Sequence, residues 1–284
     1  MLSKKSIIYC ILLFLFSCSK DSKQKEHTAH YIFISHILSN NNEYHFQIEL
    51  DSLNLNGYDM TLLGGDLLTS TSSSWKGMRF LDSVFNLSSP NTLWSIGNHD
   101  NSSPENIKII TKKNLNYSYI KNNIGFVVLN TQENNGSISQ KQIDIIEKLK
   151  ESNISYMIIM HHKLIWMPEN DSLEQMIPKI SNALIGPDSC GYCLHKNNFY
   201  SELYPKLIKI KNKGINVICL GGDSGLYSKF FQYITPEGII FLASGLMEGV
   251  PNNKAIKFTH YIEKDSLKWE AIPISKIQNA LKHY

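Results

Sequence analysis

The stretch Thr92-Leu93-Trp94-Ser95-Ile96-Gly97-Asn98-His99-Asp100 joins a short apolar run to a compact polar cluster. Residues 92–96 predict a buried strand, and the glycine after them permits a tight turn. The amide, imidazole and carboxylate that follow can bind divalent cations or transfer protons. By itself Gly-Asn-His-Asp is also typical of an ordinary turn, so its meaning depends on the rest of the chain.

Similar polar clusters follow four other predicted strands, at 31–35, 60–63, 156–160 and 215–220. These clusters are Ser35-His36, Gly64-Gly65-Asp66, His161-His162 and Gly221-Gly222-Asp223. In open α/β sheets, ligands bind beyond the carboxyl ends of the strands, where loops bring several side chains to one point. The sequence therefore predicts one site that is assembled from five distant segments.

The remaining apolar pattern alternates between strand and helix periods. Further strands are predicted at 126–130, 230–234, 239–243, 256–262 and 267–272. Helical spacing relates three sets of apolar residues, which we interpret as core faces: Trp75, Met78, Leu81 and Phe85; Ile143, Ile146 and Leu149; Leu203, Leu207 and Ile210. Strand–helix alternation followed by hairpins predicts one α/β domain in which helices cover sheets.

The composition excludes several classes of protein. The chain has 284 residues, of which 42% are hydrophobic and only 19% charged, which is typical neither of a disordered chain nor of a coiled coil. Its net charge is +3, and without Lys4 and Lys5, which lie in a segment expected to be removed, 26 basic residues face 25 acidic ones. So weak a charge does not attract nucleic acid, and no nucleic-acid partner is expected.

Residues 1–17 have the features of an export signal. Lys4 and Lys5 precede the apolar run 7–16, which is too short to span a bilayer. Leu15-Phe16-Ser17-Cys18 resembles the lipobox of bacterial lipoproteins, which implies a lipid anchor on Cys18 and a location in the cell envelope, on the outer membrane or the periplasmic face. An ordinary secretory signal with an incidental cysteine is the alternative. The predicted organisation is a signal peptide at 1–17, a tether at 18–30 and one domain at 31–284.

Three cysteines follow Cys18. Cys219 lies in an apolar strand and is interpreted as a small buried hydrophobic residue. Cys190 and Cys193 have the spacing of redox or zinc motifs, but no second such pair accompanies them. In an exported protein, a local disulfide between them is the expected state.

The order and spacing of the polar clusters resemble the calcineurin-like metallophosphoesterases, a family that includes the purple acid phosphatases. The family pattern runs D-x-H, G-D, G-N-H-D/E, a histidine that closes a strand, and G-H-x-H. Gly97-Asn98-His99-Asp100 is the most specific match, with Gly65-Asp66 before it and His161 after it. The resemblance covers nearly the whole mature domain. It implies a four-layer α-β-β-α sandwich, in which two mixed sheets are flanked by helices in a single domain.

The resemblance also implies a metal site formed by Asp66, Asn98, His161 and Asp223. In the family the G-D aspartate bridges two metals, while the asparagine and the strand-closing histidine bind the second. Asp223 stands at the first histidine of G-H-x-H, which completes that second site. A turn or a helix N-cap is the alternative interpretation of Asp223.

The first metal site of the family is degenerate in this chain. His36 and Leu38 stand at the aspartate and histidine of D-x-H, and Gly225 stands at the last histidine of G-H-x-H. Leucine and glycine side chains cannot coordinate a metal. We therefore expect one well-formed metal site, with a second metal absent or weakly held.

Three residues are expected to carry catalysis if the resemblance holds. His99 would protonate the leaving oxygen or donate to a phosphoryl oxygen, with Asp100 orienting its ring. A protonated His36 would supply positive charge, although a structural histidine at the strand end is equally open. His162 is expected on the strand face opposite His161, unless the strand has already ended there. The histidines outside these clusters are interpreted as surface residues: His27, His30, His45, His195, His260 and His283.

Two functions remain open. The first is a metal-dependent hydrolase of phosphate esters in the bacterial cell envelope; the second is a catalytically inactive binding or scaffold protein of the same family. Retention of Asn98-His99-Asp100 favours the first, and the losses at Leu38 and Gly225 favour the second. The ligand set leans towards manganese or magnesium over iron or zinc. The expected partner is a small phosphate ester or an envelope phospho-compound. A serine hydrolase using Ser224 is disfavoured, because the G-x-S-x-G elbow is lacking.

Overall fold

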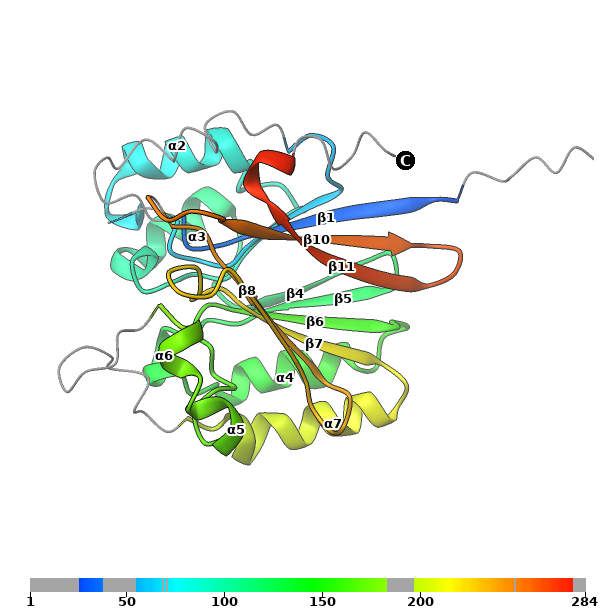
Figure 1. The fold of residues 1–284 in the computed structure, drawn as a ribbon. Coiled ribbons are helices and arrows are strands. Elements are labelled where there is room, and N and C mark those ends of the chain that lie inside the picture. Colours follow the sequence, from blue (N-terminus) through cyan, green and yellow to red (C-terminus); the bar gives the residue numbers. More distant parts are fainter. Residues whose placement is uncertain are drawn as a thin grey trace, which may run out of the picture.

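The structure is a computed structural model that describes residues 26–37, 55–67, 69, 71–182, 197–247 and 249–277. Two sheets face each other in the middle of the molecule, and helices cover the outer face of each (Figure 1). This is the expected α/β sandwich of two mixed sheets flanked by helices. The predicted signal peptide, Cys18, Leu38 and the Cys190–Cys193 pair lie outside the described residues.

The first sheet has five strands in the order β11-β10-β1-β2-β3. Strands β1 (Thr28–Ile34), β2 (Met60–Leu63) and β3 (Thr92–Trp94) are parallel. β10 (Lys254–Tyr261) and β11 (Ser266–Pro273) continue the sheet antiparallel on the other side of β1. The carboxyl ends of β1, β2 and β3 therefore lie along one edge.

The second sheet has six strands in the order β4-β5-β6-β7-β9-β8. Its four central strands are parallel: β5 (Ile124–Val128), β6 (Tyr156–His161), β7 (Asn216–Gly221) and β9 (Ile240–Ser244). The antiparallel strands β4 (Tyr117–Lys121) and β8 (Phe230–Ile234) form its two edges.

Three apolar cores bind the layers together, as side-chain alternation in the strands requires. One core lies between the sheets and contains Tyr31, Phe126, Ile158 and Phe258. A second joins the first sheet to α2 (Trp75–Phe85) and α3 (Pro104–Thr111). The third joins the second sheet to its helices: α4 (Gln140–Leu149), α5 (Asp171–Glu174), α6 (Ile177–Ile180) and α7 (Tyr204–Asn212).

Short helical turns occupy several of the connections. These are η1 (Thr71–Ser73), η2 (Asp100–Ser102), η3 (Glu133–Gly136), the π-helical turn η4 (Phe199–Leu203) ahead of α7, and η5 (Ile274–Lys276). Among the described residues, no helix combines the length and apolarity needed to cross a membrane.

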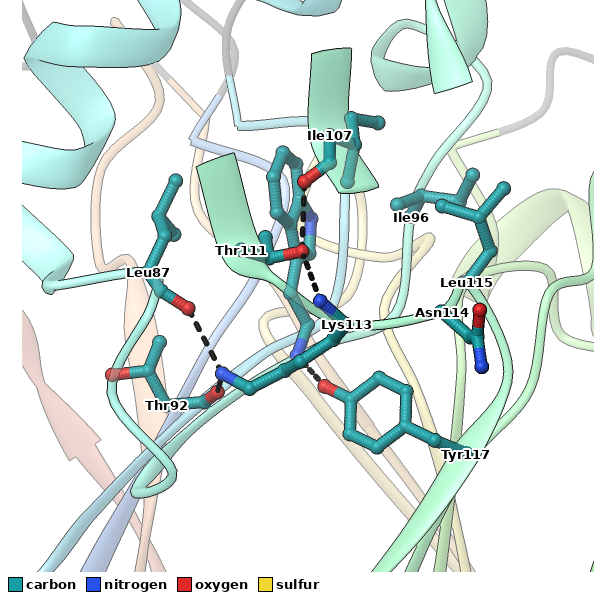
Figure 2. A pocket seen from close by; sticks show the side chains of 10 residues that line it. Leu87, Thr92, Ile96, Ile107, Thr111, Lys113, Asn114, Leu115 and Tyr117 are labelled. Atoms are coloured by element: carbon teal, nitrogen blue, oxygen red, sulfur yellow. Dashed lines mark hydrogen bonds between the residues drawn. The ribbon is translucent and has the colours of Figure 1, made fainter. Parts of the chain in front are cut away.

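A half-buried lysine closes the connection between α2 and β3. The Nζ atom of Lys113 donates to the carbonyl oxygens of Leu87, Ser89 and Thr92 at 2.9, 2.6 and 2.8 Å. Figure 2 shows the side chain between α3 and Tyr117, beside a cavity of about 10 Å³, which has room for about one water molecule. One ammonium group thus holds the segment after α2 and the first residue of β3.

Several expectations about single residues are corrected by the structure. β1 begins at Thr28, so residues 28–30 of the predicted tether belong to a strand of the first sheet. His30 and His260 are buried, not surface residues. Trp75, predicted to be part of a core face, is 43% exposed. Cys219 is free and buried, as predicted.

Candidate functional site

Side chains from both sheets meet where the parallel strands end. His36 follows β1, Asp66 follows β2, His162 follows β6 and Asp223 follows β7, and all four are almost completely buried. The Oδ2 atom of Asp66 lies 3.3 Å from His162 Nε2 and 3.7 Å from His36 Nε2. His36 Nε2 is also 4.0 Å from Asp223 Oδ1. We call these four residues the His–Asp cluster.

The two imidazoles of the cluster lie parallel to each other. Their ring centres are 6.4 Å apart and their planes differ by 8°. His162 Nδ1 is hydrogen bonded to the carbonyl oxygen of Gly64 at 2.8 Å, which directs Nε2 towards Asp66. Both His36 and Asp66 have a φ of 50°, a left-handed conformation that is uncommon outside glycine and that is enriched at functional sites.

Asp100 holds the backbone of the two loops that carry Asp66 and Gly97. Its carboxylate accepts hydrogen bonds from the N–H groups of Asp66, Leu67 and Gly97, at 2.7, 3.1 and 2.9 Å. The N–H of His99 in turn donates to Asp66 Oδ1 at 2.9 Å. The Gly-Asn-His-Asp segment is thus fastened to the Gly-Asp segment. Because its two oxygens bind backbone groups, Asp100 orients the loop rather than the His99 ring in the contacts described.

Two glycines allow the loops to approach so closely. A Cβ atom on Gly97 would lie 2.0 Å from Asp66 Oδ1, and one on Gly222 would lie 1.9 Å from the Gly64 carbonyl oxygen. The hydroxyl of Ser35 also donates to the Gly222 carbonyl at 2.6 Å. Any larger residue at position 97 or 222 would push the site loops apart.

The electrostatics of the cluster follow from burial and proximity. Burial alone would lower the pKa of His162, but the charge of Asp66, whose Oδ2 atom lies 3.3 Å away, raises that pKa to about 9. Burial would raise the pKa of Asp66, and the charge of His162 outweighs it, so the pKa falls well below its usual range. Burial raises the pKa of Asp223 and lowers that of His36. The dominant feature is therefore an Asp66–His162 ion pair.

His162, and not His161, belongs to the cluster. β6 ends at His161, so the alternation of the strand no longer applies to the next residue. The Nδ1 atom of His161 is hydrogen bonded to the Lys163 carbonyl at 2.7 Å, and no contact among the described residues joins its ring to Asp66 or Asp223. Burial lowers the pKa of His161 to about 4. His162 therefore lies beside Asp66 in the contacts described, while the assignment of His161 as a metal ligand stays a prediction, since its Nε2 atom is buried without a hydrogen-bond partner.

Asn98 and His99 lie at the outer side of the site. Asn98 is exposed and His99 is partly exposed, in contrast to the buried cluster. The backbone of His99 holds Asp66, as described above, and the two side chains are open to a molecule that approaches from solvent. Gly225 has a φ of +129° and carries no side chain that could reach the cluster.

Lys163 is a charged residue that the sequence reasoning did not single out. Burial lowers the pKa of its ammonium, and the nearby Asp223 carboxylate acts in the opposite direction. Its backbone N–H donates to Thr131 Oγ1 at 3.1 Å, which fixes it at the end of β6. Its position directly after His161-His162 is the sequence feature that could have identified it as a residue of the site.

The donor atoms of the cluster are chemically suited to a divalent cation. Two carboxylates and two imidazoles separated by 3.3–4.0 Å match the spacing of about 3–4 Å between ligands around one ion. His36 Nδ1, His161 Nε2 and His162 Nε2 are buried without a hydrogen-bond partner. As the side chains stand, however, no three His, Cys, Asp or Glu side chains of the described segments form an arrangement that could hold a metal ion. Coordination would therefore need small movements of these side chains, or a further ligand such as the Asn98 amide.

No protein-family model matches the chain, and no curated protein matches it. Among solved structures it is similar to a dimetal phosphatase from Danio rerio, with a TM-score of 0.52 and 12% identity over 87% of this chain and 96% of that chain. It also matches a 5'-nucleotidase precursor from Thermus thermophilus (TM-score 0.43, 11% identity) and the NAD nucleotidase of Haemophilus influenzae (TM-score 0.42, 12% identity). Both matches cover 87% of this chain, which spans 54% and 50% of those two proteins. At 12% identity, the first similarity shows a shared fold.

Proposed function

We propose that the protein hydrolyses phosphate esters with the help of one divalent cation held by Asp66, His162 and Asp223, with the Asn98 amide as a further ligand. The observation that carries the proposal is the convergence of the His–Asp cluster at the carboxyl ends of strands from both sheets. The shared fold with a dimetal phosphatase supports it. A bound cation would polarise a phosphoryl oxygen and lower the pKa of a coordinated water.

The remaining residues of the site would act on the substrate or hold the loop that does so. His99 is partly exposed at the outer side of the site, where its ring can donate a proton to the leaving oxygen. The ammonium of Lys163 and a protonated His36 would offset part of the negative charge of the phosphoryl group. Asp100 would keep the loop of His99 in register with Asp66, through its three backbone hydrogen bonds.

The substrate class and the location of the protein belong to the proposal as well. Phosphomonoesters, phosphodiesters and nucleotides all present the phosphoryl group that the site would recognise. The lipobox-like segment ending at Cys18 supports attachment to a membrane of the cell envelope. Manganese or magnesium suits a site that has two carboxylates among its ligands.

A second candidate function is a binding or scaffold protein without catalysis. It is favoured by the direct Asp66–His162 ion pair and by the lack of a formed coordination arrangement among the described side chains. In that case the buried charges hold the two sheets together and no cation is needed.

One experiment separates the two functions. The purified protein is analysed for bound metal and assayed with p-nitrophenyl and bis-p-nitrophenyl phosphate in the presence of added Mn²⁺, Mg²⁺ or Zn²⁺. We expect Asp66→Asn and Asp223→Asn to lose both cation binding and hydrolysis. We expect His99→Ala to retain the cation and to lose activity by roughly 10²- to 10⁴-fold. Asp144→Asn, which changes an exposed carboxylate on α4, is the matched control. A wild-type protein that binds no cation and hydrolyses neither ester supports the scaffold function instead.

A further inference from the structure

Two large apolar side chains lie exposed on neighbouring helices of the outer layer. Trp75, at the start of α2, is 43% exposed although it is spaced helically with the buried residues Met78, Leu81 and Phe85. Ile109, near the end of α3, is 62% exposed. Monomeric proteins expose single apolar residues routinely, but an aromatic and an aliphatic side chain lining one hollow indicate a contact surface.

The hollow between these helices has a volume of about 510 Å³. Its apolar lining includes Trp75, Ile109 and Ile110, and its polar lining includes Arg79, Asp82 and Lys112. One Asp82 oxygen already accepts the backbone N–H of Leu87 at 2.8 Å. The hollow therefore combines an apolar floor with an excess of positive charge, and we call it the α2–α3 surface.

We propose that the α2–α3 surface docks onto an anionic lipid bilayer. Tryptophan prefers the interface between lipid and water, where its ring is buried and its N–H can bond with headgroups. Arginine and lysine extend their apolar stems alongside and place their charges on anionic headgroups. Trp75, Ile109, Arg79 and Lys112 present this combination on one face.

The sequence that precedes the described residues supports a bilayer over other occupants. It contains the apolar run 7–16 and the lipobox-like Cys18. Ten residues from Cys18 to Thr28 reach at most about 35 Å when fully extended. A domain attached by so short a segment keeps one of its faces close to the membrane. The α2–α3 surface has a composition that suits that contact.

Docking in this way would set the orientation of the candidate site. α2 and α3 follow the segments that carry Asp66 and Asp100 along the chain. A bilayer held by these two helices would therefore fix the angle at which the site meets the membrane. The inference rests on the membrane attachment proposed above but not on hydrolysis, so a failure of the docking test is distinguishable from a loss of phosphatase activity.

The test measures which face of the full chain meets lipid. The chain is reconstituted into vesicles of phosphatidylglycerol and brominated phosphatidylcholine, and bromine quenching of tryptophan emission is recorded. We expect quenching of the wild type to fall by about half or more in Trp75→Phe, because Trp94 and Trp166 are buried and the fourth tryptophan, the half-buried Trp269 on β11, lies outside the α2–α3 surface. In the Trp75→Phe background, Ile109→Trp should restore the quenching.

Two other exposed isoleucines, on different elements, supply the matched controls. Ile120 on β4 is 45% exposed and Ile234 on β8 is 56% exposed. In the Trp75→Phe background, Ile120→Trp and Ile234→Trp should show no added quenching. Vesicles without phosphatidylglycerol, or high salt, should weaken the signal at positions 75 and 109. Equal quenching at all four positions would overturn the proposal, as would a concentration-dependent shift of Trp75 emission without vesicles, which indicates a second copy as the occupant.

Discussion

At the scale of single residues, Gly97 controls how closely the two halves of the site approach. A methyl group at position 97 would fall 2.0 Å from Asp66 Oδ1, so the carboxylate or the loop must move. We expect Gly97→Ala to weaken cation binding and to lower the free energy of unfolding by roughly 1–3 kcal/mol. Calorimetric titration with Mn²⁺ and urea denaturation measure the two effects.

Gly214→Ala is the matched control for this substitution. Gly214 follows α7 with a φ of +94°, and a Cβ atom there would have nothing within 4 Å. The variant should lose about 1 kcal/mol, because alanine disfavours the left-handed conformation, and it should bind the cation like the wild type. If both glycine variants bind Mn²⁺ equally well, the close packing at position 97 does not shape the site.

His161 and His162 provide a second comparison between neighbours. His162 contacts Asp66, whereas His161 is hydrogen bonded to the Lys163 carbonyl. We therefore expect His162→Ala to weaken Mn²⁺ binding by more than the roughly 10- to 100-fold that loss of an outer ligand contact causes. His161→Ala should leave the binding constant nearly unchanged. The opposite ranking in a titration of both variants would restore the assignment suggested by the sequence.

The sequence could predict which segments meet, but not which of two adjacent side chains faces the site. Asp66 and Asp223 were identified because each follows an apolar run and a glycine, a pattern that survives without tertiary information. The choice between His161 and His162 depends on whether the strand extends one residue further, and that is decided by pairing with β7, where His161 lies opposite Gly221. The distribution of burial between Trp75 and Met78 likewise depends on how α2 packs beside α3.

At the scale of elements, Lys113 connects the end of α2, the following turn and β3. Burial lowers the pKa of its ammonium to about 8 from 10.5. Between these two values the folded protein binds fewer protons than the unfolded chain. The free energy of unfolding contributed by Lys113 should therefore rise as the pH increases from about 8 to 10.5. Below pH 8 the lysine is charged in both states and its contribution is constant.

Lys113→Met removes this titration and serves as the reference. Urea denaturation of both proteins at several pH values between 7 and 10.5 gives the difference in stability. We expect the stability of the wild type relative to the variant to increase over the upper part of that range. The neutral amine has two hydrogens and can still donate to two of the three carbonyls of Leu87, Ser89 and Thr92. A difference that does not change with pH would show that Lys113 remains charged throughout.

Elements with strong periodicity were predicted close to their observed bounds. Strands β2 and β8 match the predicted ranges, and β7 is displaced by one residue. β4 was not predicted, because its side chains are alternately half-buried and exposed and give no continuous apolar run. α3 has only eight residues, too few for a clear helical repeat. Its packing against α2, rather than its own sequence, stabilises it.

At the scale of the whole molecule, the two sheets are joined at both ends. The His–Asp cluster joins them at the carboxyl ends of the parallel strands. At the amino end of β6, the Ser155 hydroxyl donates to Asp265 Oδ2, in the turn between β10 and β11. Asp265 Oδ1 also lies 3.3 Å from His260 Nε2, and the Tyr156 hydroxyl accepts the N–H of Leu267 at 3.2 Å. This second set of contacts between the sheets, which we call a junction like the first, uses only hydroxyl groups of Ser155 and Tyr156 on the β6 side. It does not involve the candidate site.

Because the two junctions are at opposite ends of the sheets, they should contribute separately to stability and to binding. Ser155→Ala leaves one oxygen of Asp265 without its described donor and should lower the free energy of unfolding by about 1 kcal/mol. Mn²⁺ affinity should stay unchanged, since effects at distant sites are nearly additive. The double variant with His162→Ala, measured by urea denaturation, should show the sum of the two single effects. A loss of stability in the double variant that differs from this sum by more than about 0.5 kcal/mol would mean that the two sites are energetically coupled. The candidate site would then depend on contacts along the whole length of the sheets.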